Sequence, residues 1–207
     1  MTKIFIEAKD KRTSEYYFLQ AIINRFFPNA TIEFITMNGI GNLYNETNLN
    51  QIELAQDMGE QVVVLADADT VAKGYGFARR KAEIDNGMTA NAVSFPYFLY
   101  PNNKDDGDVE TLMETAARRD LHSVFFDCFN DYEVCVSDVK DESGKQKYNV
   151  PNLKSKLHTY MAAQKLSRKL RDRLGKGDWL FDNTDYWNLE VDTLQPLKEF
   201  LAKYLAR

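Results

Sequence analysis

The sequence has very few of the residues that many metal-binding and nucleophilic sites use. Its 207 residues contain only two histidines, His122 and His158, and two cysteines, Cys128 and Cys135. This scarcity excludes a histidine-rich metal site, and the cysteine spacing does not match a Cys-x-x-Cys metal or redox motif. Apolar neighbours surround both cysteines, so we expect buried, reduced thiols. Any catalysis must therefore use carboxylates, lysines or backbone groups.

Long apolar runs are also missing. No stretch approaches the roughly 18–20 apolar residues that cross a bilayer, and the opening MTKIFIEAKD lacks the apolar centre of a signal peptide. The composition is that of an ordinary globular protein, with 44% hydrophobic and 28% charged residues, which excludes global disorder. We therefore expect a cytoplasmic protein with no membrane partner.

Acidic residues are scarce in one segment. Residues 154–176 contain eight lysines and arginines and one acid, a net +7, whereas the whole chain carries −5. The overall charge argues against non-specific nucleic-acid binding, but a basic segment on an acidic protein can still contact phosphate groups. Lys165, Arg168 and Lys169 are therefore candidate contacts to a nucleic-acid backbone. A solvated helix face is the alternative interpretation of the same pattern.

Strand and helix patterns alternate along the first half of the chain. Short apolar or β-branched runs predict strands, and apolar residues at helical spacing predict the helices between them. The predicted strands are 3–7, 31–36, 61–69 and 90–101, and the predicted helices are 14–27, 48–58 and 72–85. This alternation indicates βαβ units and an α/β core with a mostly parallel sheet, which we assign to residues 1–118.

The second half is predicted to be mostly helical. Apolar periodicity predicts helices over 108–120, 122–136, 153–174 and 192–207, and a polar stretch predicts an exposed loop over 138–152. Residues 119–207 are therefore expected to form an α-helical C-terminal extension that packs on the core.

Three acidic residues follow two of the predicted strands. Glu7 ends the first strand, and Asp67 and Asp69 end the apolar run QVVVLADAD. In open α/β sheets, ligands sit at the carboxyl ends of the strands. Carboxylates that converge there repel each other unless a cation lies between them, and Mg²⁺ accepts carboxylate oxygens. The sequence therefore predicts one acidic site for Mg²⁺ (or Mn²⁺) formed by these three side chains.

The order of these motifs resembles the Toprim domain. IFIEAKD, then ITMNGIGN, then VVVLADAD are similar to its pattern of a strand ending in glutamate, a later strand followed by glycine, and a strand ending in Asp-x-Asp. The resemblance covers about residues 1–115. The phrase FLYPNNKDDGDVETLM is similar to one in small, uncharacterised bacterial Toprim-like proteins related to OLD-family nucleases.

This resemblance implies a Toprim-like, Rossmann-like sheet and metal-dependent phosphodiester chemistry on DNA or RNA. It implies that Glu7, Asp67 and Asp69 are the catalytic residues. Asp67 and Asp69 would hold the metal, and Glu7 would be a further ligand or the general acid/base. The most plausible activity is that of a nuclease, with a partner protein or a homo-oligomer as a further expectation.

The flanking ligands depart from the family pattern. Many Toprim proteins have glycine directly after the glutamate, where this chain has Ala8. Many nuclease members have a second acid four residues after the glutamate, where this chain has Lys11. Asp10 lies one position earlier and is a weaker candidate. For a second metal, Asp108 and Glu110 are candidates, although the same two residues also fit a helix N-terminus.

Other candidates lie in the loops that follow the strands. Gly39 and Gly41 would allow the backbone to approach a phosphate group, or they simply belong to a loop. Lys104 would neutralise phosphate charge, or it lies on a solvated loop.

Two alternative functions remain open. The chain would be a non-catalytic, nucleotide- or nucleic-acid-binding module of a defence or repair system. Alternatively, LADADTV satisfies the motif of haloacid dehalogenase-type phosphatases, with Asp67 as nucleophile and Asp69 as acid/base. The second alternative leaves Glu7 without a role, and that motif normally lies on the first strand.

Overall fold

Four strands form one sheet in which all neighbouring strands are parallel. The computed structural model describes residues 1–205. The strands are β1 (Thr2–Ile6), β2 (Ile32–Thr36), β3 (Gln61–Asp67) and β4 (Tyr97–Tyr100), in the order β2-β1-β3-β4. The predicted α/β fold with a parallel sheet is confirmed. Because the strands are parallel, their carboxyl ends meet at one edge of the sheet.

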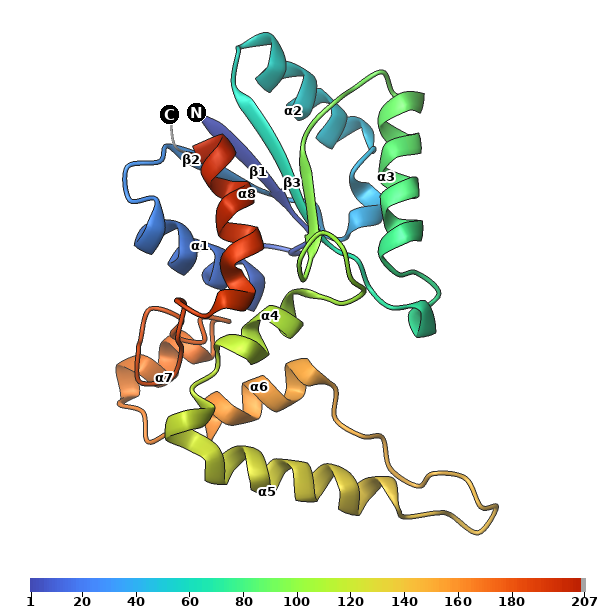
Figure 1. The fold of residues 1–207 in the computed structure, drawn as a ribbon, viewed down its shortest axis with the longest axis vertical. Helices are drawn as coiled ribbons and strands as arrows, with labels where there is room; N and C mark the ends of the chain where they lie inside the picture. Colours follow the sequence, from blue (N-terminus) through green and yellow to red (C-terminus); the bar gives the residue numbers. More distant parts are fainter. Residues whose placement is uncertain (206–207) are drawn as a thin grey trace.

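Helices cover both faces of this sheet (Figure 1). Alternate side chains of β1 enter two separate cores: Ile4 and Ile6 join one, and Phe5 joins the other. The first core includes side chains of α1 (Ser14–Phe26) and α8 (Gln195–Leu205), and the second includes side chains of α2 (Glu46–Asp57) and α3 (Phe77–Ala90). This double covering explains why β3 reads as a continuous apolar run.

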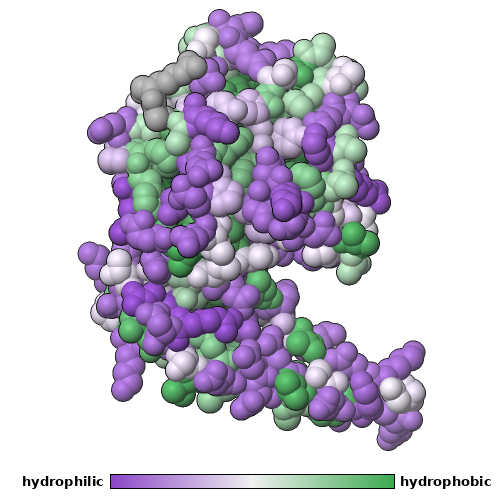
Figure 2. Space-filling view, in the orientation of Figure 1, coloured by the Kyte–Doolittle hydropathy of each residue, from purple (hydrophilic) through white to green (hydrophobic). Residues whose placement is uncertain are grey.

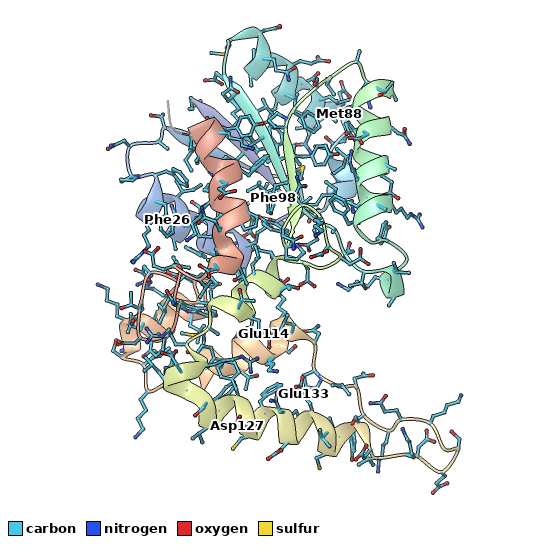
Figure 3. All side chains as sticks on the ribbon, in the orientation of Figure 1. Phe26, Met88, Phe98, Glu114, Asp127 and Glu133 are labelled. Atoms are coloured by element: carbon cyan, nitrogen blue, oxygen red, sulfur yellow. The ribbon has the colours of Figure 1, made fainter. Side chains whose placement is uncertain are left out.

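The helical second half begins below the sheet and returns to it. It consists of α4 (Val109–Ala116), α5 (Arg119–Ser137), α6 (Leu153–Ala162), α7 (Arg168–Leu174) and α8. In Figure 3, Phe98 of β4 lies next to α8, and its ring centroid is 5.4 Å from that of Phe200. The predicted boundary at 118/119 falls between α4 and α5, but one apolar core contains residues from both sides of it.

α5 and the following loop project from the body as an arm (Figure 1). The amino group of Lys156 on α6 ties the arm to the body, because it lies 3.5 Å from Glu114 of α4 and 3.4 Å from Glu133 of α5. Figure 2 shows the surface hollowed between the body and this arm. The N-terminal ends of α4 and α6 lie at the hollow.

Several predicted boundaries were wrong, and glycine conformation and a side-chain cap explain two of them. The helix predicted over 72–85 starts only at Phe77, because Gly74 and Gly76 have φ values of 84° and 101°. A short 3₁₀ turn, Val71–Lys73, precedes them. The helix predicted over 153–174 is divided into α6 and α7, and the side chain of Ser167 caps the start of α7.

Other predicted elements are shorter than expected. The strand predicted over 90–101 is limited to β4, and the helix predicted over 108–120 ends at Ala116. The helix predicted over 122–136 extends from Arg119 to Ser137, with a kink at His122. The C-terminal helix predicted over 192–207 begins with a 3₁₀ turn, Asp192–Leu194, and residues 206–207 lie outside the described part.

The prediction of buried thiols was also wrong, because Cys128 and Cys135 are exposed on α5. The arm packs through another side of this helix, where Phe126 and Phe129 are buried. Within residues 1–205, no helix combines the length and the apolar character that crossing a bilayer requires.

Candidate functional site

Glu7 and Asp67 lie together at the carboxyl edge of the sheet. Glu7 follows β1 directly, and Asp67 is the last residue of the neighbouring strand β3. The backbone N–H of Asp67 donates to Oε1 of Glu7 (3.0 Å), and the backbone N–H of Val109 donates to Oδ1 of Asp67 (2.8 Å). These two bonds join β1, β3 and the start of α4 around two carboxylates.

Burial raises the pKa of both carboxyl groups. For Glu7, desolvation outweighs the opposing effects of the Asp67 N–H and of Arg80. For Asp67, desolvation acts together with repulsion from Glu7, Glu15 and Glu110, and its pKa rises well above its ordinary value. For both groups, the hydrogen bonds that the carboxylate accepts do not offset the cost of burying its charge.

Two further acids complete this group, which we call the acid cluster: Glu7, Glu15, Asp67 and Glu110. Glu15 lies in the first turn of α1 and Glu110 in the first turn of α4, and each is 8% exposed. Desolvation and the charge of Glu7 raise the pKa of Glu15 to about 8. One cation beside the cluster is Lys154, at the start of α6, whose Nζ lies 2.9 Å from Oε1 of Glu110.

Sequence reasoning missed Glu15, although a signal for it existed. In a parallel α/β sheet, the helix that follows a strand starts near that strand's carboxyl end. An acid in the first turn of α1 is therefore expected near Glu7, which ends β1. A prediction from strand ends alone omits such a residue, because it takes no account of helix starts.

Polar atoms without partners are buried beside the acid cluster. Tyr100, the last residue of β4, is fully buried, and its hydroxyl makes no hydrogen bond within the described chain. Burial raises its pKa well above the ordinary value, and repulsion from Glu15, Asp67, Glu7 and Glu110 adds to the effect. Oε1 of Glu15 and the hydroxyl of Ser14 are buried without a hydrogen-bond partner as well.

Both carboxylate oxygens of Asp69 are in ion pairs, although its negative charge still acts on Glu7 and raises the pKa of that carboxyl group. Nη2 of Arg80 lies 2.9 Å from Oδ2, and Nζ of Lys73 lies 3.3 Å from Oδ1. Arg80 is buried, and its guanidinium lies 4.1 Å from the ring centroid of Tyr75. Asp69 has a φ of 58°, which turns its backbone out of the direction of β3. The two carboxylates of the Asp-x-Asp motif therefore have different partners: two cations for Asp69 and a backbone N–H for Asp67.

Asp108 belongs with Asp69, and we call these two residues the paired acids. Its Oδ1 accepts from the backbone N–H of Thr111 (3.1 Å), which caps α4, and its Oδ2 lies 3.5 Å from Nζ of Lys73. Asp10 interacts locally with Arg12: its Oδ1 accepts from the Arg12 backbone N–H (2.6 Å), and its carboxylate pairs with the Arg12 guanidinium (3.5 Å).

The candidate loop residues have different positions. The backbone N–H of Gly39 donates to the backbone carbonyl of Glu7 (2.8 Å), so the loop after β2 lies against the site. Gly39 has a φ of 100°, which favours glycine, whereas Gly41 shows no such constraint. Lys104 is exposed on the loop after β4.

The three cations proposed for nucleic-acid contact lie on α7 and the loop before it. Lys165, Arg168 and Lys169 are exposed, and no ion pair joins them to any acid in residues 1–205. Lys154 and Lys156 belong to the same basic segment but are engaged in ion pairs with glutamates. The segment therefore divides into a structural part and a free, solvated part.

Comparison with known proteins identifies a family. Residues 2–206 match the family described as "Protein of unknown function (DUF3226)". The chain belongs to this family. No curated protein and no solved structure matches it.

The donor chemistry of this DUF3226 chain fits a hard divalent cation. Within residues 1–205, no three Asp, Glu, His or Cys side chains are positioned to coordinate a metal ion as they stand, so the acids of the cluster would have to draw together around one. The acid cluster nevertheless offers carboxylate oxygens, the ligands that Mg²⁺ and Mn²⁺ prefer. One of these oxygens, Oε1 of Glu15, is buried without a hydrogen-bond partner. A cation would satisfy it and relieve the repulsion between the four acids.

Proposed function

We propose that this protein carries out Mg²⁺- or Mn²⁺-dependent phosphodiester chemistry on nucleic acid, as a nuclease of Toprim/OLD-like type. The observation that carries the proposal is the acid cluster at the carboxyl edge of a parallel sheet. Four acids gather there, and burial together with mutual repulsion raises the pKa values of Glu7, Glu15 and Asp67. Such an arrangement is costly for a purely structural role and is typical of cation-dependent sites.

In this proposal, Glu7 and Asp67 hold the cation, and their positions are fixed by the backbone bonds between β1, β3 and α4. A bound divalent cation would activate a water molecule and neutralise charge on the leaving oxygen. The backbone N–H of Gly39 holds the loop after β2 against Glu7, and Gly39 itself adds no side chain there. The hollow between body and arm gives a nucleic acid room to approach the starts of α4 and α6 (Figure 2).

The exposed cations Lys165, Arg168 and Lys169 are proposed to contact the nucleic-acid backbone. Their support is that they are solvated and free of ion pairs within residues 1–205, so binding a phosphate would break no existing interaction. The proposal also includes a cytoplasmic location, where the exposed thiols of Cys128 and Cys135 would remain reduced.

The decisive test measures cleavage of single- and double-stranded DNA and RNA with Mg²⁺, with Mn²⁺ and with a chelator. We expect metal-dependent cleavage by the wild type and none by Asp67→Asn, which keeps the shape of the side chain but removes its charge. Asp105→Asn is the matched control, because Asp105 is an exposed acid of the loop after β4. Absence of cleavage by the wild type on every substrate, or unchanged cleavage by Asp67→Asn, would overturn the nuclease proposal.

A non-catalytic nucleic-acid-binding module is the second candidate. It is favoured by the ion pairs of Asp69 with Arg80 and Lys73, which occupy a carboxylate that a Toprim-like nuclease would use. Binding of DNA or RNA without metal-dependent cleavage would support it. The less favoured phosphatase with Asp67 as nucleophile predicts hydrolysis of a phosphomonoester and an aspartyl phosphate on Asp67.

A further inference from the structure

Glu15 is the residue near the site whose burial is hardest to explain by folding alone. An acid in the first turn of a helix is normally favourable because it faces the positive end of the helix dipole in water. Glu15 is instead 8% exposed, and its Oε1 has no hydrogen-bond partner in the described chain. The cap of α1 is already supplied by Thr13, whose hydroxyl accepts from the backbone N–H of Tyr16 (3.3 Å). Backbone hydrogen bonds from Ala8 and Glu7 lower the pKa of Glu15, but they do not offset its burial, and Oε1 stays without a partner. Neither capping nor the helix dipole therefore accounts for Glu15.

We propose that Glu15, and not Asp69, joins Glu7 and Asp67 as a protein ligand of the divalent cation. The inference rests on the proposed function only in requiring a cation at the acid cluster. It changes the ligand set expected from the Asp-x-Asp motif, since it removes that motif's second aspartate and adds a residue from the start of α1.

The surroundings of Glu15 favour this assignment. Its carboxyl group is buried, and the charges of Glu7 and Glu110 both act on it. The unpartnered hydroxyl of Tyr100, fully buried at the end of β4, interacts most strongly with the charge of Glu15 among the four acids. This hydroxyl is a second buried polar group directed into the cluster, and it can donate a hydrogen bond to a carboxylate or to a water on the cation.

The interactions of Asp69 argue against it as a ligand. Its oxygens are held by Arg80 at 2.9 Å and by Lys73 at 3.3 Å. If Asp69 turned to a cation at the acid cluster, the buried guanidinium of Arg80 would lose this partner and retain only Glu83. Uncompensated buried charge is costly, whereas Glu15 has an oxygen with no partner to lose.

The test measures binding of Mn²⁺ to the full chain, by the loss of the electron paramagnetic resonance signal of free Mn²⁺ and by the shift of the thermal midpoint. Wild type is compared with Glu15→Gln and Asp69→Asn. Glu46→Gln is the matched control, because Glu46 lies in the first turn of α2 but is exposed. Circular dichroism confirms that each variant is folded at the temperature of the binding experiment.

We expect Glu15→Gln to weaken Mn²⁺ binding by at least about ten-fold and to lose the thermal shift, since removing groups that position a metal commonly costs 10–100-fold. Asp69→Asn and Glu46→Gln should bind within about three-fold of the wild type, because neither removes a group that the inference places on the cation. Glu15→Asp, which keeps the charge on a shorter stem, should bind more tightly than Glu15→Gln.

Each outcome decides the inference. Unchanged binding by Glu15→Gln overturns it. So does loss of binding in Asp69→Asn with retention in Glu15→Gln, although the proposed function then survives with the ligands that the sequence predicted. If the wild type binds no Mn²⁺, both fail. If Mn²⁺ binds through Glu15 but no nucleic acid is cleaved, the inference stands and the nuclease proposal fails.

Discussion

The acid cluster and the paired acids lie at the same end of the sheet but are stabilised differently. Asp69 and Asp108 are neutralised within the fold by Arg80 and Lys73, and Asp108 also caps a helix. Glu7, Glu15 and Asp67 accept few hydrogen bonds and have raised pKa values.

The difference shows which carboxylates the fold can neutralise by itself. Asp69, Asp108 and, within the cluster, Glu110 are matched by the protein's own cations and need no external one. Those left unmatched in a buried place depend on protons or on an external cation. Proximity in the sequence does not decide membership, because Asp67 and Asp69 fall into different groups.

The largest effect is expected from pH in the absence of metal. Because the pKa of Glu15 is raised to about 8 in the folded state, its stabilising contribution is complete below its unfolded value of 4.5 and is lost as pH rises towards about 8. One proton changes the free energy of unfolding by about 1.4 kcal/mol per pH unit, so wild type should lose about 3 kcal/mol between pH 5.5 and 7.5 relative to Glu15→Gln. Urea denaturation with a chelator at both pH values measures this difference.

The exposed first-turn acid Glu46 supplies the control for this experiment. Glu46→Gln should follow the pH dependence of the wild type. If Glu15→Gln and Glu46→Gln behave alike, then Glu15 does not belong to a group of unmatched acids, and the contrast with the paired acids disappears.

A smaller effect is expected from the cation that neutralises Asp69. Arg80→Met removes a buried guanidinium that pairs with Asp69 and Glu83. Breaking a buried ion pair costs about 3–5 kcal/mol, and the partial exposure of Asp69 reduces the expected loss of stability to about 2–3 kcal/mol. Arg79→Met is the control, because Arg79 pairs with Glu83 but is 62% exposed, and such pairs contribute about 0–1 kcal/mol. Equal shifts of the urea midpoint for both variants would contradict the assignment of Arg80 as the internal counter-charge.

The smallest effect concerns the glycine loop beside Glu7. Gly39→Ala should destabilise the protein by about 1–3 kcal/mol, because its φ of 100° and ψ of 145° are strained for a residue with a side chain. Gly41→Ala has open space and no positive φ, so its effect should stay within about 0.5 kcal/mol. The thermal midpoints of the two variants are compared with that of the wild type. If both midpoints shift equally, the backbone conformation at position 39 does not require glycine.

Much of the fold could be predicted because periodicity reports burial. The apolar run that opens the predicted strand 61–69 indicated a strand covered on both faces, and β3, which ends two residues earlier at Asp67, is such a strand. Boundaries were less predictable where local chemistry competes with periodicity. Gly74 and Gly76 delay α3, and Ser167 starts α7 anew inside a stretch with a helical pattern. Exposure of Cys128 and Cys135 could not be inferred, because an apolar helix gives no information about which of its sides finds a partner.

The sequence by itself predicted the parallel sheet and placed Glu7 and Asp67 at the carboxyl ends of two of its strands. The tertiary structure made those two strands neighbours, because β1 and not β2 lies beside β3 in the order β2-β1-β3-β4. Only the tertiary structure decided which other carboxylates join them. Glu15 and Glu110 enter from the first turns of α1 and α4, whereas Asp69 turns to Arg80, a residue of the following helix. The presence of strands and helices follows from hydrophobic patterning along the chain, but the order of the strands and the matching of buried charges depend on contacts between elements that are distant in sequence.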